Sequence, residues 1–361
     1  MRPATSPRGS REARLLLIDR CRRSVHDRRV EELPTFFGPG DVVVLNDSGT
    51  LPASLRVRLG PADFEVRLLR RRSEQVFEAA LLGAGDWRLR TEARPAPPTL
   101  PVGARLGFGS GLSARLIMHC EESERHVMLR FDQSGAEFYE ALYRLGRPIQ
   151  YAHLDRPLEL WDVQNSYAGA PWSMELPSAG RSLTVGTIQR LRERGVRVVS
   201  LTHEAGVSST GDPAIDARLP LPERYRIPEV AARAVNDAEG AVIAVGTSVV
   251  RALESAAIGG VVQAGGGVAT LRIEPHTQLH VVNALLTGMH QPGESHYELV
   301  SAFVGEGFLE QANRYAADED YLAHEFGDST LIACDVDGAR ANTNRPTFER
   351  EAPSPELGPA G

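Results

Sequence analysis

The residues best suited to acid–base chemistry lie in polar stretches that follow predicted strands. His203 ends a predicted strand in LTHEAGVSSTGD, a position from which histidine can act as a general acid or base. A hydrogen-bonded structural histidine is the alternative interpretation. His290 lies in TGMHQPGESHYELVSAF with Glu294 and His296. These three side chains could bind a metal, but their spacing matches no zinc signature, and we predict that the protein holds no metal.

A second candidate site is the junction between strand and helix in AVIAVGTSVVRALES. The predicted strand ends at Gly246, Thr247 and Ser248 follow, and the predicted helix carries Arg251 and Glu254 on one face. The free N–H groups and hydroxyls at such a helix start could hold a carboxylate or a phosphate. The alternative is a capped helix after an ordinary strand.

Two lone charges, Glu175 and Arg181, stand among apolar neighbours in APWSMELPSAGRSLT. A buried carboxylate without a partner is costly or becomes neutral. We therefore expect Glu175 beside Arg181, another arginine or a ligand cation.

Two regions of different pattern must position these residues. Apolar runs at 15–18 and 41–46 predict the opening strands of a sheet. From about 56 to 130 the chain consists of short alternating segments broken by Gly and Pro, which is typical of a small all-β barrel. After a linker at 148–157, helical and strand signals alternate, which predicts an α/β body.

Local signals set several boundaries in the α/β body. Thr184 is a good N-cap for a helix that ends at Gly195, and the predicted strand VRVVSLT follows. Pro228 opens the predicted helix EVAARAVNDAEG, which precedes a strand at 241–245. The Pro-rich segment at 349–361 is predicted to be frayed.

Composition excludes some classes of function. The chain has 361 residues, of which 42% are hydrophobic and 24% charged, the balance of a soluble globular protein. A net charge of −7 argues against indiscriminate binding to nucleic acid, although a local basic patch remains possible. Arginines concentrate near the N-terminal end, either as such a patch or as ordinary solvated side chains: Arg20, Arg22, Arg23, Arg28, Arg29, Arg70, Arg71 and Arg72.

Cysteine usage and hydropathy predict the compartment. Cys21, Cys120 and Cys334 are scattered and form no CxxC pair, so we expect neither a disulfide framework nor a zinc knuckle. No apolar run approaches the roughly 20 residues of a membrane span. We predict a cytoplasmic protein in a reducing compartment, without membrane contact.

Eight segments occur in the order of a known family: VVVLNDSGTLPASL, NSYAGAP, LPSAG, LTHEAG, PERYRIP, VIAVGTSVVRALES, ALLTGMHQP and LVSAF. Through these segments the chain, from about Leu15 to Ile332, resembles the S-adenosylmethionine:tRNA ribosyltransferase-isomerases of queuosine biosynthesis. The resemblance implies a large α/β barrel-like domain, at 1–55 and 149–361, with a small all-β barrel domain inserted at 56–148.

The resemblance also implies the reaction and its partners. The ribosyl part of S-adenosylmethionine (SAM), the co-substrate, passes to 7-aminomethyl-7-deazaguanine in tRNA, and adenine and methionine are released; no metal and no protein partner are expected. A base must remove a proton beside the sulfonium. The residues implied are His203, Glu223 and His290 for catalysis; Pro177, Ser178, Gly180, Gly246, Thr247, Ser248 and Arg251 for SAM; and Tyr167, Glu175 and Arg181 in the substrate pocket.

The chain departs from the family pattern at several polar positions. Ser182 stands where the family has the histidine of PTAGLHF, and Glu175 stands where a small residue is usual. In the stretch that the family writes H-x-M-H-x-E, Arg218 and Leu221 replace the histidines and Glu223 keeps the glutamate. We predict a SAM-dependent non-methyl transferase with the family reaction on tRNA. The departures taken alone favour the first alternative, a paralogue that cleaves SAM at the sulfonium for a small-molecule acceptor, or by elimination, without tRNA. The second alternative is a non-catalytic SAM- or RNA-binding protein.

Overall fold

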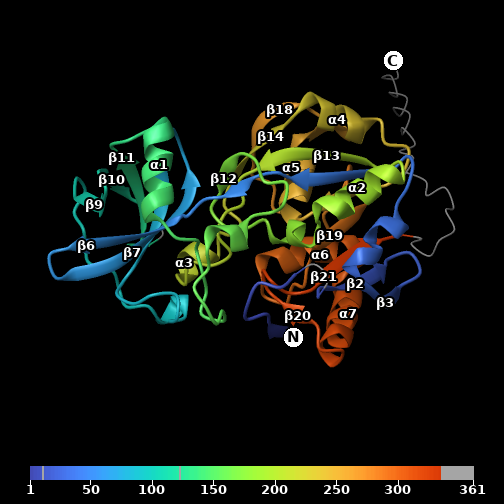
Figure 1. The fold of residues 1–361 in the computed structure, drawn as a ribbon, viewed down its shortest axis with the longest axis horizontal. Coiled ribbons are helices and arrows are strands. Elements are labelled where there is room, and N and C mark those ends of the chain that lie inside the picture. The colour runs from blue at the N-terminus through green and yellow to red at the C-terminus, as the bar shows by residue number, and fades with distance from the viewer. Residues whose placement is uncertain (10–11, 122, 335–361) are drawn as a thin grey trace, which may run out of the picture.

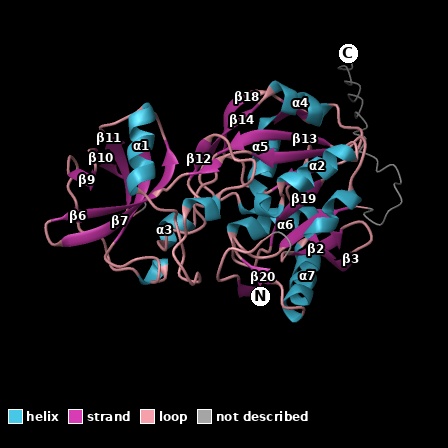
Figure 2. Ribbon diagram, in the orientation of Figure 1, coloured by secondary structure: helices cyan, strands magenta, loops and turns pink. Residues whose placement is uncertain are grey.

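The computed structural model describes residues 1–9, 12–121 and 123–334, and the predicted frayed segment at 349–361 lies outside them. Figure 1 shows a β-rich region on one side and a larger region on the other, in which helices surround a central sheet. The same division is visible when the ribbon is coloured by secondary structure (Figure 2). The mixed α/β class predicted from the sequence is confirmed.

A nine-stranded sheet forms the centre of the larger region, with the order β18-β14-β13-β4-β15-β19-β21-β2-β3. The neighbours β13, β4, β15 and β19 pair in parallel, so their carboxyl ends meet at one edge. The order ends at β18 and β3, and barrel-like closure of this region stays a prediction. The strands are β2 (Arg14–Asp19), β3 (Ser24–Arg29), β4 (Val42–Asn46), β13 (Arg197–His203), β14 (Glu223–Ile227), β15 (Val242–Val245), β18 (Gly265–Ala269), β19 (Ala284–Gly288) and β21 (Ser329–Ala333).

Both faces of this sheet are covered. Val42 and Val44 pack in one core with α4, α5, α6 and α7, whereas Val43 and Leu45 pack in another with α2 and η1. Side chains alternate between the faces of a strand, so burial on both faces explains the unbroken apolar run of β4. The elements named are η1 (Val30–Phe36), α2 (Val185–Glu193), α4 (Glu229–Asn236), α5 (Thr247–Ala256), α6 (Ser295–Val304) and α7 (Glu306–Asp318). None of the helices in the described ranges combines the length and apolar character needed to span a membrane.

The β-rich region is a six-stranded antiparallel sheet with the order β6-β7-β8-β11-β10-β9. Its outer strands β6 and β9 contact each other, so the sheet is nearly closed. Helix α1 (Gly135–Leu145) packs Phe138, Ala141 and Leu142 into the same core, so the expectation of an all-β region at 56–148 missed one helix. The strands are β6 (Ser54–Leu59), β7 (Ala62–Arg71), β8 (Val76–Leu82), β9 (Arg105–Gly109), β10 (Leu112–His119) and β11 (His126–Phe131).

Short elements complete the described chain. Three strand pairs lie outside the two large sheets: β1 (Arg2–Pro3) with β20 (Leu322–Ala323), β5 (Gly49–Thr50) with β12 (Pro171–Ser173), and β16 (Ala257–Ile258) with β17 (Val261–Val262). The short helices are η2 (Thr91–Ala93), η3 (Leu160–Val163), η4 (Ser178–Ser182) and α3 (Pro213–Asp216).

The helix starts predicted from local signals are confirmed, whereas the helix predicted to continue to Gly240 ends at Asn236. Thr184 is the N-cap of α2, and its hydroxyl accepts a hydrogen bond from the N–H of Thr187. Pro228 is the N-cap of α4, and the strand predicted at 241–245 is β15. His203 is the last residue of β13, as expected.

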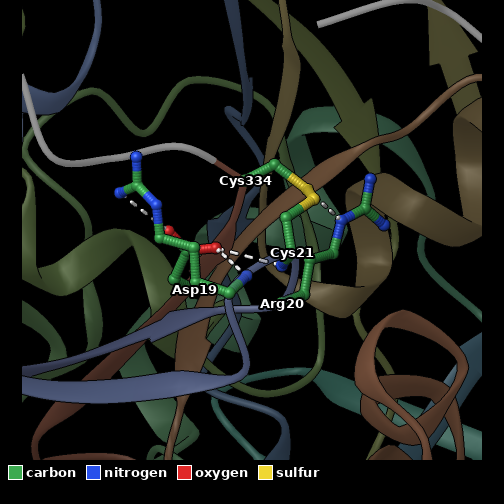
Figure 3. Close-up of a disulfide and its surroundings, with 5 residues drawn as sticks. Asp19, Arg20, Cys21 and Cys334 are labelled. Atoms are coloured by element: carbon green, nitrogen blue, oxygen red, sulfur yellow. Dashed lines mark hydrogen bonds and ion pairs between the residues drawn. A yellow bond between two sulfur atoms is a disulfide. The ribbon is translucent and has the colours of Figure 1, made fainter. Parts of the chain in front are cut away.

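A disulfide joins Cys21 and Cys334 across a sequence separation of 313 (Figure 3). The expectation that the scattered cysteines form no disulfide was therefore wrong. Parallel pairing of β2 with β21 places Asp19 opposite Ala333, so the cysteines that follow these residues meet. The Nε of Arg20 donates to the sulfur of Cys334 at 3.2 Å.

Candidate active site

A cavity of about 720 Å³ lies between the two regions and contains most of the residues singled out from the sequence. Segments that follow parallel strands line it: 205–209 after β13, 246–248 after β15 and 287–290 at the end of β19. Ligands of open α/β sheets bind at the carboxyl ends of the strands, and this cavity has that position. Its size is typical of a pocket for a small molecule.

The junction of β15 and α5 opens into the cavity. Gly246 has φ +96°, a conformation that favours glycine, and a Cβ there would lie 3.4 Å from the Cβ of Ala179. Thr247 and Ser248 form the first turn of α5 and line the cavity with Gly246. The first N–H groups of a helix have no partner within the helix, so this junction can bind an anionic group.

Glu223 and Arg251 form a buried ion pair at the cavity wall. A guanidinium nitrogen of Arg251 donates to Glu223 Oε2, and the N–H of Gly206 donates to Oε1 at 2.8 Å. Arg251 also donates to the carbonyl of Ala269 at 3.0 Å. Burial raises the pKa of Glu223, and the charge of Arg251 opposes that rise. Both side chains line the cavity, but their mutual contact fixes them in place.

His203 lies behind Glu223 rather than in the cavity wall. Its side chain has no solvent exposure, and its Nε2 lies 3.6 Å from Glu223 Oε2. Within the described ranges, neither ring nitrogen has a hydrogen-bond partner. Burial lowers the pKa of His203 to about 3, and the charge of Arg251 adds to the effect. The imidazole is therefore neutral near pH 7, and Glu223 lies between it and the cavity.

Glu175 lines the cavity and is held by neutral groups. Tyr151 donates its hydroxyl to Glu175 Oε1, and Ser208 donates its hydroxyl at 2.7 Å and its N–H at 3.1 Å to Oε2. Among the described residues it forms no ion pair, and the nearby guanidinium of Arg67 lies 5.6 Å from the centre of the Tyr151 ring. Burial raises the pKa of Glu175 to about 7, against the hydrogen bonds from Tyr151 and Ser208.

Of the partners expected for Glu175, Arg181 does not contact it, and the arginine near it is Arg67. Arg181 donates to the carbonyls of Asp162, at 2.6 Å, and Arg8, at 2.9 Å, and its guanidinium lies 4.6 Å from the centre of the Phe326 ring. Arg181 lines a smaller neighbouring pocket instead of the main cavity. Its hydrogen bonds to the carbonyls of Asp162 and Arg8 join two chain segments.

Two further predicted residues pack beside the cavity without lining it. A Cβ on Gly180 would collide with the hydroxyl of Tyr167 and the amide of Asn165, which gives this glycine a packing role. Burial raises the pKa of Tyr167. Pro177 and Ser178, by contrast, line the cavity as predicted for the same segment.

His290 belongs to a cluster of titratable groups on the cavity wall. Its Nε2 lies 2.8 Å from Thr287 Oγ1, and its Nδ1 lies 3.5 Å from Glu294 Oε2. The ring of His296 is 5.3 Å from that of His290, and burial lowers the pKa of His296 to about 3. All four residues line the cavity, so the sequence had grouped side chains that do lie together.

Several residues of the cavity were missed because the segment at 148–157 was interpreted as a linker. Tyr151 and His153 lie in that segment and line the cavity. His153, His324 and Glu325 offer ligand atoms within 4.8 Å of one another, an arrangement that could hold a metal ion. The expected absence of a metal stays a prediction. The sequence signal that could have identified this part of the cavity is the pair Tyr151 and His153, which lies between Pro148 and Pro157.

A cavity at the carboxyl ends of parallel strands, with a helix N-terminus and a buried ion pair in its wall, is typical of an enzyme that binds a small polar molecule. Residues 2–332 match the family described as queuosine biosynthesis protein. The chain belongs to this family.

Two sequence relatives agree with that assignment. The chain is 38% identical over 325 residues to the S-adenosylmethionine:tRNA ribosyltransferase-isomerase of Thermus thermophilus, which covers 85% of this chain and 88% of the relative. It is 32% identical over 348 residues to the protein of the same name from Rhodospirillum rubrum, covering 92% and 94%. A crystal structure of an S-adenosylmethionine tRNA ribosyltransferase from Thermotoga maritima is 24% identical, with a TM-score of 0.49, covering 91% of this chain and 96% of that one.

Proposed function

We propose that this protein is an S-adenosylmethionine:tRNA ribosyltransferase-isomerase that acts in queuosine biosynthesis. The relatives of that name, matched over most of both chains, support this function. The main structural support is that one cavity contains both a helix start that can bind an anion and two carboxyl groups. These carboxyl groups, Glu175 and Glu223, have different surroundings. The matches do not favour the small-molecule paralogue or the non-catalytic protein that we considered from the sequence.

SAM carries an anionic carboxylate and a cationic sulfonium, and the cavity offers complementary charge for each. The N–H groups of Thr247 and Ser248 suit the carboxylate of the methionine part. Glu175, Glu294 and Glu325 lie elsewhere on the same wall and suit the sulfonium. Pro177 and Ser178 would close the side of the pocket next to Gly246.

The reaction needs a proton acceptor beside the sulfonium and help for departing adenine. The charge of Arg251 favours the ionised form of Glu223 and their contact fixes the side chain, so we assign Glu223 to stabilise the positive charge of SAM. We assign His290 to contact adenine, because it lines the cavity and is oriented by Thr287 and Glu294. His203, predicted as a catalytic residue, is assigned a positioning role behind Glu223.

We infer that tRNA approaches from the side where the β-rich region meets the cavity, because an exposed arginine lies there. Arg70 is buried in an ion pair with Glu78 and cannot serve phosphates, which removes it from the basic patch considered from the sequence. Arg90, whose side chain is 80% exposed, lines the cavity and is a better candidate. We also propose that residues 56–148 form an inserted domain of a barrel-like fold and that the enzyme works in the cytoplasm, where tRNA is modified.

The test is incubation with SAM, with and without bulk tRNA that carries 7-aminomethyl-7-deazaguanine. Adenine, methionine, methylthioadenosine and homoserine lactone are followed by mass spectrometry. We expect adenine and methionine to appear only with tRNA. Consumption of SAM at the same rate without tRNA would contradict a tRNA substrate, and methylthioadenosine would indicate attack on the aminocarboxypropyl side.

A further inference from the structure

Both protonation states of Glu175 have hydrogen-bond partners in the wall of the cavity. The hydroxyl oxygen of Tyr151 lies within hydrogen-bond distance of Glu175 Oε1 and 3.1 Å from the carbonyl of Ser209. When Glu175 is ionised, the Tyr151 hydroxyl donates to it. When Glu175 is protonated, it can donate to Tyr151, whose hydroxyl then donates to Ser209.

The charges around Glu175 favour reversible protonation. Glu325 lies close enough to disfavour the carboxylate, whereas Arg67 lies behind Tyr151 and favours it. His153 stacks on Tyr151 at 6.4 Å between ring centres and lies 3.2 Å from Glu325 through its Nε2. Among the described residues no arginine forms an ion pair with Glu175, whereas Arg251 forms one with Glu223. A general base works best when its pKa lies near the pH of the reaction.

We propose that Glu175 is the catalytic base that removes the proton from the carbon beside the SAM sulfonium. This inference rests on the function proposed above, and it assigns the base for this chain alone, because Glu175 stands where the family usually has a small residue. In the step, the C5′–H bond breaks, the proton passes to a carboxylate oxygen of Glu175, and the electron pair stays on C5′ next to the positive sulfur. Glu175 becomes a neutral carboxylic acid, and Tyr151 and Ser209 accept the rearranged hydrogen bonds.

The test measures proton removal separately from product formation. The full-length protein is incubated in D2O with SAM and bulk tRNA that carries 7-aminomethyl-7-deazaguanine, and deuterium at C5′ of recovered SAM is measured by NMR. Glu175→Gln keeps the shape of the side chain and removes its ability to accept the proton. We expect it to lower both exchange and turnover at least about 100-fold, with SAM affinity within about threefold. Glu229→Gln, on the exposed face of α4, is the matched control.

A second variant separates catalysis from folding. Glu175→Ala removes the carboxylate, and added formate should restore exchange in this variant but not in Glu175→Gln, where the amide fills the space. Exchange at the wild-type rate in Glu175→Gln, or no exchange in the wild-type protein, would overturn the assignment. Exchange that depends on Glu175 but yields no modified tRNA would support the base and contradict the proposed tRNA substrate.

Discussion

Glu175 and Glu223 are bound by N–H groups only two residues apart, because Ser208 donates to the first and Gly206 to the second. One short loop after β13 thus holds two carboxyl groups in the wall of the same cavity. Their remaining partners differ, since Glu223 has the charge of Arg251 whereas Glu175 has the hydroxyl of Tyr151. Carboxyl groups in contrasting environments can divide their roles, one staying ionised while the other exchanges a proton.

The first prediction concerns the pH dependence of activity. If Glu175 must be ionised to act, kcat/KM falls as the pH drops below about 7, the pKa that burial gives this group. The hydrogen bond from Tyr151 lowers that pKa, so Tyr151→Phe should move the acid limb to higher pH. The exposed Tyr143→Phe is a matched control and should leave the profile unchanged. A limb that stays in place or moves to lower pH in Tyr151→Phe would contradict this account.

The second prediction concerns stability. The pKa of Glu175 rises from 4.5 to about 7 in the folded protein, so folding is most favourable while the group is protonated and loses free energy as the pH rises through this interval. Glu175→Gln removes that loss. The variant should therefore gain stability over wild type between pH 5 and pH 8, by up to about 3 kcal/mol. Urea unfolding at pH 5 and pH 8 measures the difference in the free energy of unfolding. A gain in stability that does not grow with pH would contradict a raised pKa for Glu175.

The third prediction concerns Glu223 in the cavity wall and His203 behind it. Glu223→Gln and His203→Ala should each lower turnover by more than tenfold, the first by removing the fixed charge and the second by leaving space behind it. Because His203 does not line the cavity, its loss should change kcat with little effect on the KM for SAM. Unchanged turnover in both variants would show that neither Glu223 nor His203 contributes to catalysis.

The fourth prediction separates Arg251 from its partner. Arg251→Met leaves Glu223 buried without its charge partner and should lower the free energy of unfolding by about 3–5 kcal/mol. The double variant Glu223→Gln/Arg251→Met removes both charges and should recover part of that loss. Additive losses measured by urea unfolding would show that the two side chains do not depend on each other.

Sequence signals were reliable where the relevant contacts are local. The Thr184 cap depends on a residue three positions away, and the Gly246 junction on a strand that runs directly into a helix. The partners of Glu175 were missed because Tyr151 and Ser208 lie 24 and 33 residues away and meet it only through the packing of loops. The grouping around His290 was predicted because its members are close in sequence, whereas the place of His203 behind Glu223 depends on antiparallel pairing of β13 with β14.

The last prediction concerns the disulfide between Cys21 and Cys334, which the cysteine spacing did not predict. Neither Cys21 nor Cys334 lines the cavity, so their bond should affect stability and not the binding of SAM. Replacing both by serine should lower the free energy of unfolding by about 2–4 kcal/mol, because the bond restricts the unfolded chain. Reductant should lower the melting temperature of the wild-type protein to that of the double variant, whose own melting temperature should not respond. Cys120→Ser, at the free cysteine, is the control and should keep the response to reductant. Equal melting temperatures for oxidised and reduced wild-type protein would show that the two cysteines are not bonded in solution.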